Sequence, residues 1–324
     1  MAIDRLKNPF GSAQITSGLA PENWAYASST TGAATAYTFT GDGTAGTVNG
    51  GIYRVHRWDY TATQTGWDIT FSQAGIIDLL VCAGGAGAHG AATASYGGGG
   101  GGAGGLILNF DYGVTASNYT VSVGKGGQNA GLGPLNYDQV ATKPTDSTFG
   151  ALTAIKGGEG AMSYTTPNTG DSGGSGGGGS TRSTASAQLY AGGAGTPGQG
   201  NAGGAASGVQ EGYSGGGGGG YLTQGGDAAT DNTRVGGNGG NGLDNYKFDG
   251  IARGYAAGGG GGGYSGGSGG TGGAGGGGDG GGPSQKGQDA TGVGCGGGGN
   301  SLNASGTRGG KGSHGMVIVR YRIG

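Results

Sequence analysis

The side chains that could support acid–base or nucleophilic chemistry are few and scattered. The histidines are His56, His89 and His314, and the first and last lie in or beside sequences typical of strands. A hydrolase triad needs a histidine beside an activated serine and a carboxylate, and no strand-to-helix turn that would expose a nucleophilic serine is evident. The sequence therefore predicts no catalytic residue and no enzyme activity, and it favours a surface strand position for His56.

Two motifs match ligand-binding loops only in part. Residues 306–313 (GTRGGKGS) hold a Gly-Lys pair, but no serine or threonine directly follows Lys311, and no helix follows to bind phosphate. Asp279 precedes three glycines without the regularly spaced acidic ligands that calcium needs. Spacings like those of dinucleotide-binding loops arise by chance when 95 of 324 residues are glycine. The sequence thus predicts no metal site and no cofactor.

Cys82 and Cys295 are the two cysteines of the chain. A disulfide scaffold needs many cysteines in a short chain, so that class is excluded. The two residues could form one bridge at most. A buried free thiol is favoured for each, because unpaired cysteine is among the most buried residue types.

The charge pattern argues against nucleic acid and membrane partners. The chain has 16 Lys and Arg against 18 Asp and Glu, for a formal charge of -2, and no stretch concentrates one sign. Residues 1–7 (MAIDRLK) lack the apolar core of a signal peptide, and no run has the length of a membrane-spanning helix. We expect a protein made in the cytoplasm, with no nucleic acid partner and no membrane insertion.

Outside its glycine tracts the chain has the pattern of short strands. β-Branched and aromatic residues recur over runs of about four to eight residues, and no window has a helical period. In 316–322 one face takes Val317, Val319 and Tyr321, whereas 76–82 is apolar except for Asp78 and is expected to be buried on both sides. The expected strands are 51–59, 67–72, 76–83, 106–110, 119–124, 149–156 and 315–322.

Glycine makes up 95 of the 324 residues, about four times its share in an average protein. The glycines stand in runs rather than at every third position with abundant proline, which excludes collagen. Composition alone favours disorder, because glycine loses the most backbone entropy on folding. Against disorder, an apolar strand follows the tract, the runs have similar lengths, and aromatic residues punctuate them. The runs are 97–102, 176–179, 215–220, 258–263, 275–278 and 296–299.

Glycine runs have an ordered alternative to flexible coil. The polyproline-type left-handed helix has three residues per turn, a rise of about 3.1 Å and no internal hydrogen bonds. Every N–H and C=O then needs a partner elsewhere, and glycine lets neighbouring helices approach closely enough to supply it. The expected fold is all-β: a β-sandwich with a large glycine-rich insertion of packed polyglycine II helices and essentially no α-helix.

Six motifs follow one another along the chain: YRVH at 53–56, WDITF at 67–71, IDLLVCAGG at 77–85, GGGAGGL at 100–106, YTVSVGKGG at 119–127 and GMVIVRY at 315–321. In this order they resemble a family of glycine-rich domains of bacteriophage tail fibres and adhesins, including the tail-tip adhesins of T-even-like phages. The resemblance implies a sandwich fused to packed polyglycine helices, with loops between the helices that contact a host receptor.

Glycine use and this resemblance divide the chain into three parts. Residues 1–49 fall outside the resemblance and are expected to form a virion-attachment or oligomer-contact segment. Residues 50–156 together with 315–324 form the expected sandwich with a first glycine-rich excursion, and 157–314 form the polyglycine II domain with exposed loops. By analogy with the symmetry of phage fibres, the resemblance also implies a homotrimer.

The loops between the glycine runs are the candidate binding sites. Those richest in aromatic and polar residues are 181–191, 221–235 and 243–256. Tyrosine supplies rigid amphipathic contact area at low entropic cost, and the alternative for each tyrosine is that it caps the glycine lattice against water. Capping is favoured for Tyr213, Tyr221 and Tyr264. Receptor contact is favoured for Tyr190, Arg234, Tyr246, Lys247, Phe248 and Arg253.

The function expected from these features is binding rather than catalysis. We expect a phage virion protein on the particle surface, a tail-fibre or tail-tip adhesin. It would contact other virion proteins through its N-terminal segment and bind a glycan or protein receptor on the host. The alternative is a structural capsid decoration or head fibre with no receptor role. A cellular matrix or silk-like fibril is a third class, disfavoured by the short, unrepeated chain.

Overall fold

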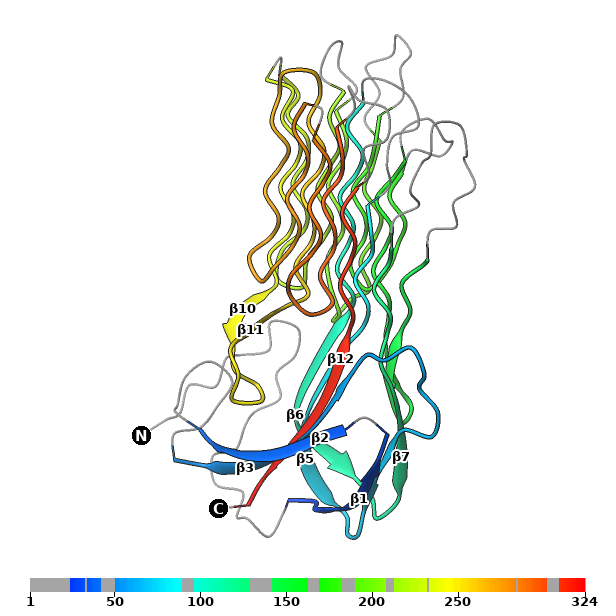
Figure 1. Ribbon diagram of the computed structural model, residues 1–324, viewed down its shortest axis with the longest axis vertical. Coiled ribbons are helices and arrows are strands. Elements are labelled where there is room, and N and C mark those ends of the chain that lie inside the picture. The colour runs from blue at the N-terminus through cyan, green and yellow to red at the C-terminus, as the bar shows by residue number, and fades with distance from the viewer. Residues whose placement is uncertain are drawn as a thin grey trace.

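The computed structural model of the chain describes residues 24–32, 34–41, 50–88, 96–128, 142–162, 169–181, 190–207, 213–231, 233–283, 285–301 and 309–323. Within these ranges the chain forms strands and extended segments and no α-helix, so the fold is all-β, as the sequence predicts. A β-sandwich lies at one end, and a long bundle of glycine-rich segments rises from it (Figure 1).

Two five-stranded antiparallel sheets build the sandwich. The first sheet has the order β2-β3-β12-β5-β6 and the second β1-β4-β7-β8-β9, while β10 and β11 pair in a separate hairpin. The strands are β1 (Ala27–Thr31), β2 (Ala34–Thr40), β3 (Ile52–Asp59), β4 (Asp68–Phe71), β5 (Gly75–Cys82), β6 (Leu106–Val114), β7 (Asn118–Ser122), β8 (Ser147–Phe149), β9 (Leu152–Ala154), β10 (Leu243–Tyr246), β11 (Arg253–Tyr255) and β12 (Met316–Arg322).

Six of the strands expected from the sequence are present, the seventh is replaced by two shorter strands, and β1, β2, β10 and β11 are additional. The expected strand 149–156 is replaced by the pair β8 and β9, because the chain turns at Gly150, whose φ of 55° suits glycine. β1 and β2, which lie within the expected virion-attachment or oligomer-contact segment 1–49, pair with β4 and β3 and so belong to the sandwich. Residues 1–23 and 42–49 of that expected segment lie outside the described residues.

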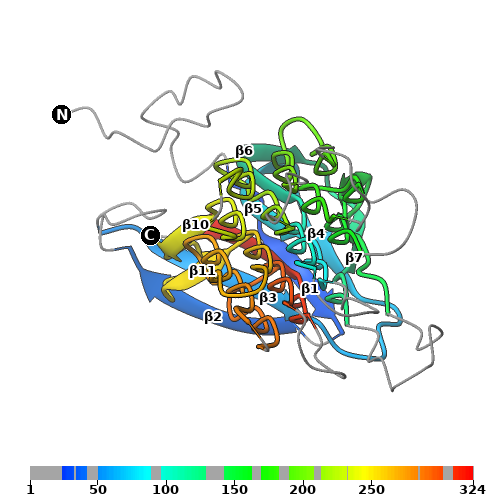
Figure 2. The same ribbon diagram turned by 90° about the horizontal axis from the view of Figure 1, so that it is seen from above.

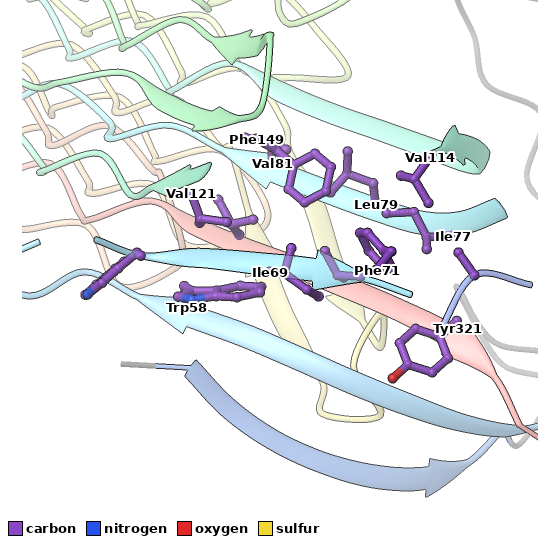
Figure 3. Close-up of a cluster of buried hydrophobic side chains, with 14 of the residues drawn as sticks. Trp58, Ile69, Phe71, Ile77, Leu79, Val81, Val114, Val121, Phe149 and Tyr321 are labelled. Carbon is purple, nitrogen blue, oxygen red and sulfur yellow. The ribbon is translucent and has the colours of Figure 1, made fainter. Parts of the chain in front are cut away.

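The first hydrophobic core fills the space between the two sheets (Figure 3). The face of β12 that carries Val317, Val319 and Tyr321 points into it, as the alternation predicts. Burial of large apolar side chains, each contributing about 1.5–3 kcal/mol, stabilises this contact between the sheets. Among its members that are at most 1% exposed are Trp58, Ile69, Phe71, Leu79 and Phe149.

The second hydrophobic core covers the opposite face of the first sheet. Leu80 and Ile318 contribute to it from β5 and β12, and Tyr246, Phe248 and Tyr255 close it from the β10–β11 hairpin and its loop. Both faces of the first sheet are therefore buried. This explains why 76–82 is apolar at nearly every position.

The exception in that apolar run, Asp78, pairs with a buried arginine. Arg320 is 2% exposed and donates from Nε and Nη2 to Asp78 Oδ2, both at 3.0 Å, and from Nη1 to the Phe248 carbonyl at 2.7 Å. The rings of Tyr53 and Phe248 lie 4.7 and 4.3 Å from the guanidinium carbon, within the range of cation–π attraction. The pair therefore joins the hairpin loop to the first sheet.

A second polar anchor holds the same loop. The fully buried carboxylate of Asp249 accepts hydrogen bonds from Tyr37 Oη at 2.7 Å, Arg57 Nη1 at 3.2 Å and Arg253 Nη1 at 3.0 Å. Burial and then the bond to Asp249 raise the pKa of Tyr37 well above its ordinary value. Because Tyr37 and Arg57 belong to β2 and β3, one carboxylate fixes the hairpin on the outer half of the first sheet.

We expect Asp249→Ala to lower the free energy of unfolding by about 3 kcal/mol, because Arg253 keeps its charge at a largely buried position without the carboxylate. Chemical denaturation measures the effect. Asp244→Ala, at an exposed position of β10, is the control and should change stability by less than about 0.5 kcal/mol. Equal losses in the two variants would contradict the anchoring role of Asp249.

His56 is buried, so the surface position favoured by the sequence is wrong. It is 6% exposed, its Nε2 lies 3.2 Å from the Tyr321 hydroxyl, and its ring stacks with those of Tyr321 and Trp58. The physical reason is the period of two in β3, which places His56 on the same face as Trp58. Burial, with the positive charge of Arg54, lowers the pKa of His56 to about 4.

This pKa predicts a loss of stability in mild acid. Between pH 6.5 and 4 the unfolded chain protonates His56 and the folded chain does not, so stability falls as the pH falls. We expect His56 to account for a decrease of about 2 kcal/mol in unfolding free energy from pH 7 to pH 5. Denaturation at both pH values, compared with His56→Phe, measures this term. An unchanged pH dependence in the variant would show that other groups cause it.

Candidate binding surface at the tip of the glycine bundle

The glycine-rich segments run side by side from the sandwich to the far end of the molecule, which we call the tip (Figure 1). Seen from above, each segment traces a narrow coil (Figure 2). Several are direct continuations of strands. β5 leads into 83–88, β7 leads into 123–128, and 309–315 leads into β12.

Segment 97–105 shows how the bundle is held together. The N–H groups of Gly97, Gly98 and Gly99 donate in turn to three different segments, at the carbonyls of Tyr213, Asn300 and Ala161. The same three segments then recur as acceptors in two further rounds, at Gly216, Gly297 and Gly158 and at Gly219, Gly294 and Ile155. The partner segment therefore repeats every third residue, which is the period of a polyproline-type helix.

The carbonyl groups of segment 97–105 bind three further segments. They accept hydrogen bonds from Gly262 and Gly259, from Gly178 and Ser175, and from Ala86 and Ala83. The segment thus has six neighbours, three bound through its N–H groups and three through its C=O groups. Segments 213–221 and 258–263 likewise donate to three neighbours and accept from three others.

These interior segments leave no room for side chains. A Cβ atom built on Gly100 would lie against the carbonyl of Gly259, and one on Gly218 against the carbonyl of Gly101, in each case far inside van der Waals contact. Neither glycine has a positive φ. Glycine is needed at these positions because the backbones approach one another closely, and not for its conformational freedom.

Uninterrupted and interrupted glycine runs occupy different places in the bundle. Residues 97–105, 215–220 and 258–263 are buried throughout. In 265–274 (SGGSGGTGGA) a larger residue follows each pair of glycines, and Ser268, Thr271 and Ala274 are exposed. In such a peripheral segment every third residue faces solvent, as a helix with three residues per turn requires.

Side chains replace neighbouring segments at the edge of the bundle. Asn238 and Asn241, three residues apart, accept hydrogen bonds through Oδ1 from the N–H groups of Thr271 and Ala274. Asp227 accepts in the same way from the N–H group of Ala205. The polar residues that interrupt peripheral glycine runs therefore complete the backbone pairing where the lattice stops.

We expect Gly218→Ala to lower the free energy of unfolding by about 3 kcal/mol, because its Cβ would force apart two segments of the lattice. Thermal or chemical denaturation measures the loss. Gly282→Ala is the matched control, since the nearest atom to its Cβ lies at 3.5 Å, and it should be neutral or slightly stabilising. A Gly218 variant as stable as the control would show that the bundle interior is not closely packed.

Three tyrosines and one arginine gather at the tip. The ring centroids of Tyr213 lie 5.3 Å from Tyr96 and 5.2 Å from Tyr264, both edge to face, and Tyr96 and Tyr264 are nearly parallel at 6.5 Å. The Arg234 guanidinium lies over the Tyr264 ring at 5.5 Å, and its Nη1 donates to the Ser265 carbonyl at 2.8 Å. We call Tyr96, Tyr213, Tyr264 and Arg234 the tyrosine cluster.

The tyrosine cluster has the chemistry of a contact surface. All four side chains are partly exposed, and their backbones belong to segments fixed in the lattice, because Gly97 donates to the Tyr213 carbonyl and Tyr264 to the Arg234 carbonyl. Aromatic rings with polar edges, next to a cation, bind a partner at low entropic cost when they are already held in place.

Two of the six residues favoured for receptor contact lie at the tip. Arg234 belongs to the tyrosine cluster. Tyr190 is partly exposed, and its carbonyl accepts a hydrogen bond from Ala206 in the adjacent segment. Among the described residues, no aromatic contact joins the ring of Tyr190 to the tyrosine cluster.

The other four residues favoured for receptor contact lie at the sandwich end, and two of them, Tyr246 and Phe248, are too buried to contact a receptor. Tyr246 and Phe248 are 3% and 0% exposed and belong to the second core. Arg253 pairs with Asp249, and Lys247 is partly buried in the same loop. The physical reason is that 243–256 is a hairpin packed on the first sheet rather than a loop open to solvent.

Tyr213 and Tyr264, for which the sequence favours capping, lie at the ends of interior runs but are partly exposed, so a partner can also reach them, whereas Tyr221 is buried in the second core. The sequence analysis missed Tyr96. The sequence feature that could have revealed Tyr96 is its position beside a long glycine run. Tyr96 and Tyr213 precede the runs 97–102 and 215–220, and Tyr264 follows the run 258–263. Because the third run is antiparallel to the other two, all three tyrosines meet at one end.

The described residues offer few groups for other chemistry. Cys82 and Cys295 are buried free thiols, and burial raises the pKa of Cys295 to about 12 and that of Cys82 well above its ordinary value, so neither is an activated nucleophile. No group of three or more His, Cys, Asp or Glu side chains gathers as metal ligands within the described ranges. The described part of the chain also contains no helix long and apolar enough to cross a membrane.

These observations define an all-β protein in which a sandwich carries a bundle held together by backbone hydrogen bonds. A family model described as a glycine-rich domain matches residues 61–322, which is most of the chain. The chain therefore belongs to this glycine-rich domain family, and the matched range contains five of the six motifs, all except YRVH at 53–56. A search of curated proteins finds no match.

Proposed function

We propose that the chain is a bacteriophage virion protein, a tail-fibre or tail-tip adhesin that binds a host surface receptor through the tip of its glycine bundle. The observation that carries this proposal is the tyrosine cluster, a partly exposed aromatic and cationic surface at the end farthest from the sandwich. The resemblance of its motifs to phage adhesin domains supports the phage origin.

The glycine segments are, in this proposal, polyglycine II helices. The support is their pairing with period three and the exposure of every third residue in peripheral segments. Such a lattice keeps the tip rigid, so that a receptor binds without ordering the surface first. The comparison of Gly218→Ala with Gly282→Ala tests the lattice itself.

The chain reverses direction repeatedly at the tip. The described residues on both sides of 89–95, 182–189 and 208–212 lie there, as the pairing of Gly97, Ser180 and Tyr213 shows. Many sequence-distant segments therefore reach one surface. We place receptor recognition, of a glycan or a protein, at this end and the attachment to other virion proteins at the sandwich end.

The test is adsorption of the purified chain to bacterial cells that are host to a phage carrying it. We expect the double variant Tyr213→Ser/Tyr264→Ser to bind at least about thirtyfold more weakly, as expected for central aromatic contacts. Ile251→Ser, exposed at the sandwich end, should bind as the unaltered chain does. Unfolding curves of each variant check that the bundle is intact.

A structural role without receptor binding is the alternative, as a capsid decoration or head fibre. Adsorption that is absent, or equal in the tip variant and the control, together with labelling of the whole capsid by an antibody against the chain, would support it. Labelling confined to the tail, with blocked infection by the purified chain, would support the adhesin.

A further inference from the structure

The outer strands on one side of the sandwich form two open sheet edges. β1 is the last strand of the second sheet and β2 the last strand of the first sheet, with only Gly32 and Ala33 between them. Among the described residues, β2 pairs on one side alone, with β3. From Trp24 to Gly41 the chain contains no charged residue and no proline.

The β2 edge lacks the features that usually prevent edge strands from pairing. Natural edges carry charges, proline or bulges that block the addition of another strand. β2 keeps an unbroken register with β3 from Ala34 opposite Trp58 to Thr40 opposite Ile52. Its side chains Thr35, Ala36, Thr38 and Thr40 are exposed, and no described strand pairs with its outer side.

The opposite edge of the same sheet is protected. β6 pairs with β5 through a register shift between Ile77 and Leu79, and Asp111 on β6 has a φ of 62°. Asp111 also donates its N–H to the Asp78 carboxylate. A bulge of this kind bends the strand and interrupts the row of N–H and C=O groups along its outer edge. A ring of copies that joins β2 of one subunit to β6 of the next is therefore disfavoured.

In place of the homotrimer that the resemblance to phage fibres implies, we propose that two copies of this chain pair through β2, antiparallel, about a two-fold axis near Tyr37. In that register Ala36 lies opposite Thr38 of the partner subunit, and Thr35 lies opposite Phe39 of the partner subunit. No charges oppose one another, and about six backbone hydrogen bonds form, two for each hydrogen-bonded pair. The two five-stranded sheets become one continuous sheet.

The exposed apolar residues near β2 are consistent with this contact. Ile52 and Ile323 are 41% and 45% exposed, and the N–H of Ile323 donates to the carbonyl of Ile52. Ile52 lies opposite Thr40 at the end of β2. A partner strand beside β2 would reduce the access of water to this corner of the sheet. The proposal is independent of receptor binding at the tip.

The test is the molar mass of the full chain by light scattering over a series of concentrations. We expect a dimer of twice the 30.5 kDa chain mass. A36E/T38E places like charges opposite one another across the two-fold axis and should raise the dissociation constant of the dimer by about tenfold or more. Within each chain, the new carboxylate at 38 lies opposite Arg54, so folding is not opposed.

The matched control is A36K/T38E, which changes the same two positions but places opposite charges across the axis. We expect it to keep a dissociation constant close to that of the unaltered chain. Equal unfolding midpoints for the two variants show that both are folded. A monomer at every concentration, a trimer, or equal weakening by both variants would overturn the proposal.

Discussion

An interior glycine segment must pair its backbone N–H and C=O groups with other segments, because it makes no hydrogen bonds within itself. Segment 97–105 meets this requirement with six neighbours. A net gain of about 0.5–1.5 kcal/mol per hydrogen bond falls short of the cost of ordering each residue, about 1–2 kcal/mol. The bundle therefore depends on the sandwich, which holds in place the ends of β5, β6, β7 and β12 from which glycine segments extend.

Much of the fold follows from local sequence patterns. The alternation in β12 predicted which side chains face each core, and the apolar run of β5 predicted burial on both faces, because these properties are set by neighbours within one strand. The hairpin of β10 and β11 was not predictable in this way. Its loop is held by Arg320, Tyr37 and Arg57, which are distant in sequence, so a local pattern of tyrosine and charge looked like an exposed loop.

The candidate site was predictable only in part for a related reason. Stretches between glycine runs alternate between the sandwich end and the tip, and their composition does not reveal which end they occupy. Arg234 and Tyr246 are close in sequence but lie at opposite ends. The spacing of non-glycine residues does contain the missing information, since a larger residue at every third position marks a segment with one face in solvent, and unbroken glycine marks the interior.

The threefold rotation of bonding partners along each interior segment limits how this protein can change in length. A single residue inserted within 97–105 would rotate every later N–H group toward the wrong neighbour, and the mismatch would extend to the end of the segment. An insertion where the chain reverses at the tip does not change which neighbour each N–H group of a segment faces. Related sequences can therefore gain or lose residues freely at the distal reversals, while interior segments keep a constant count.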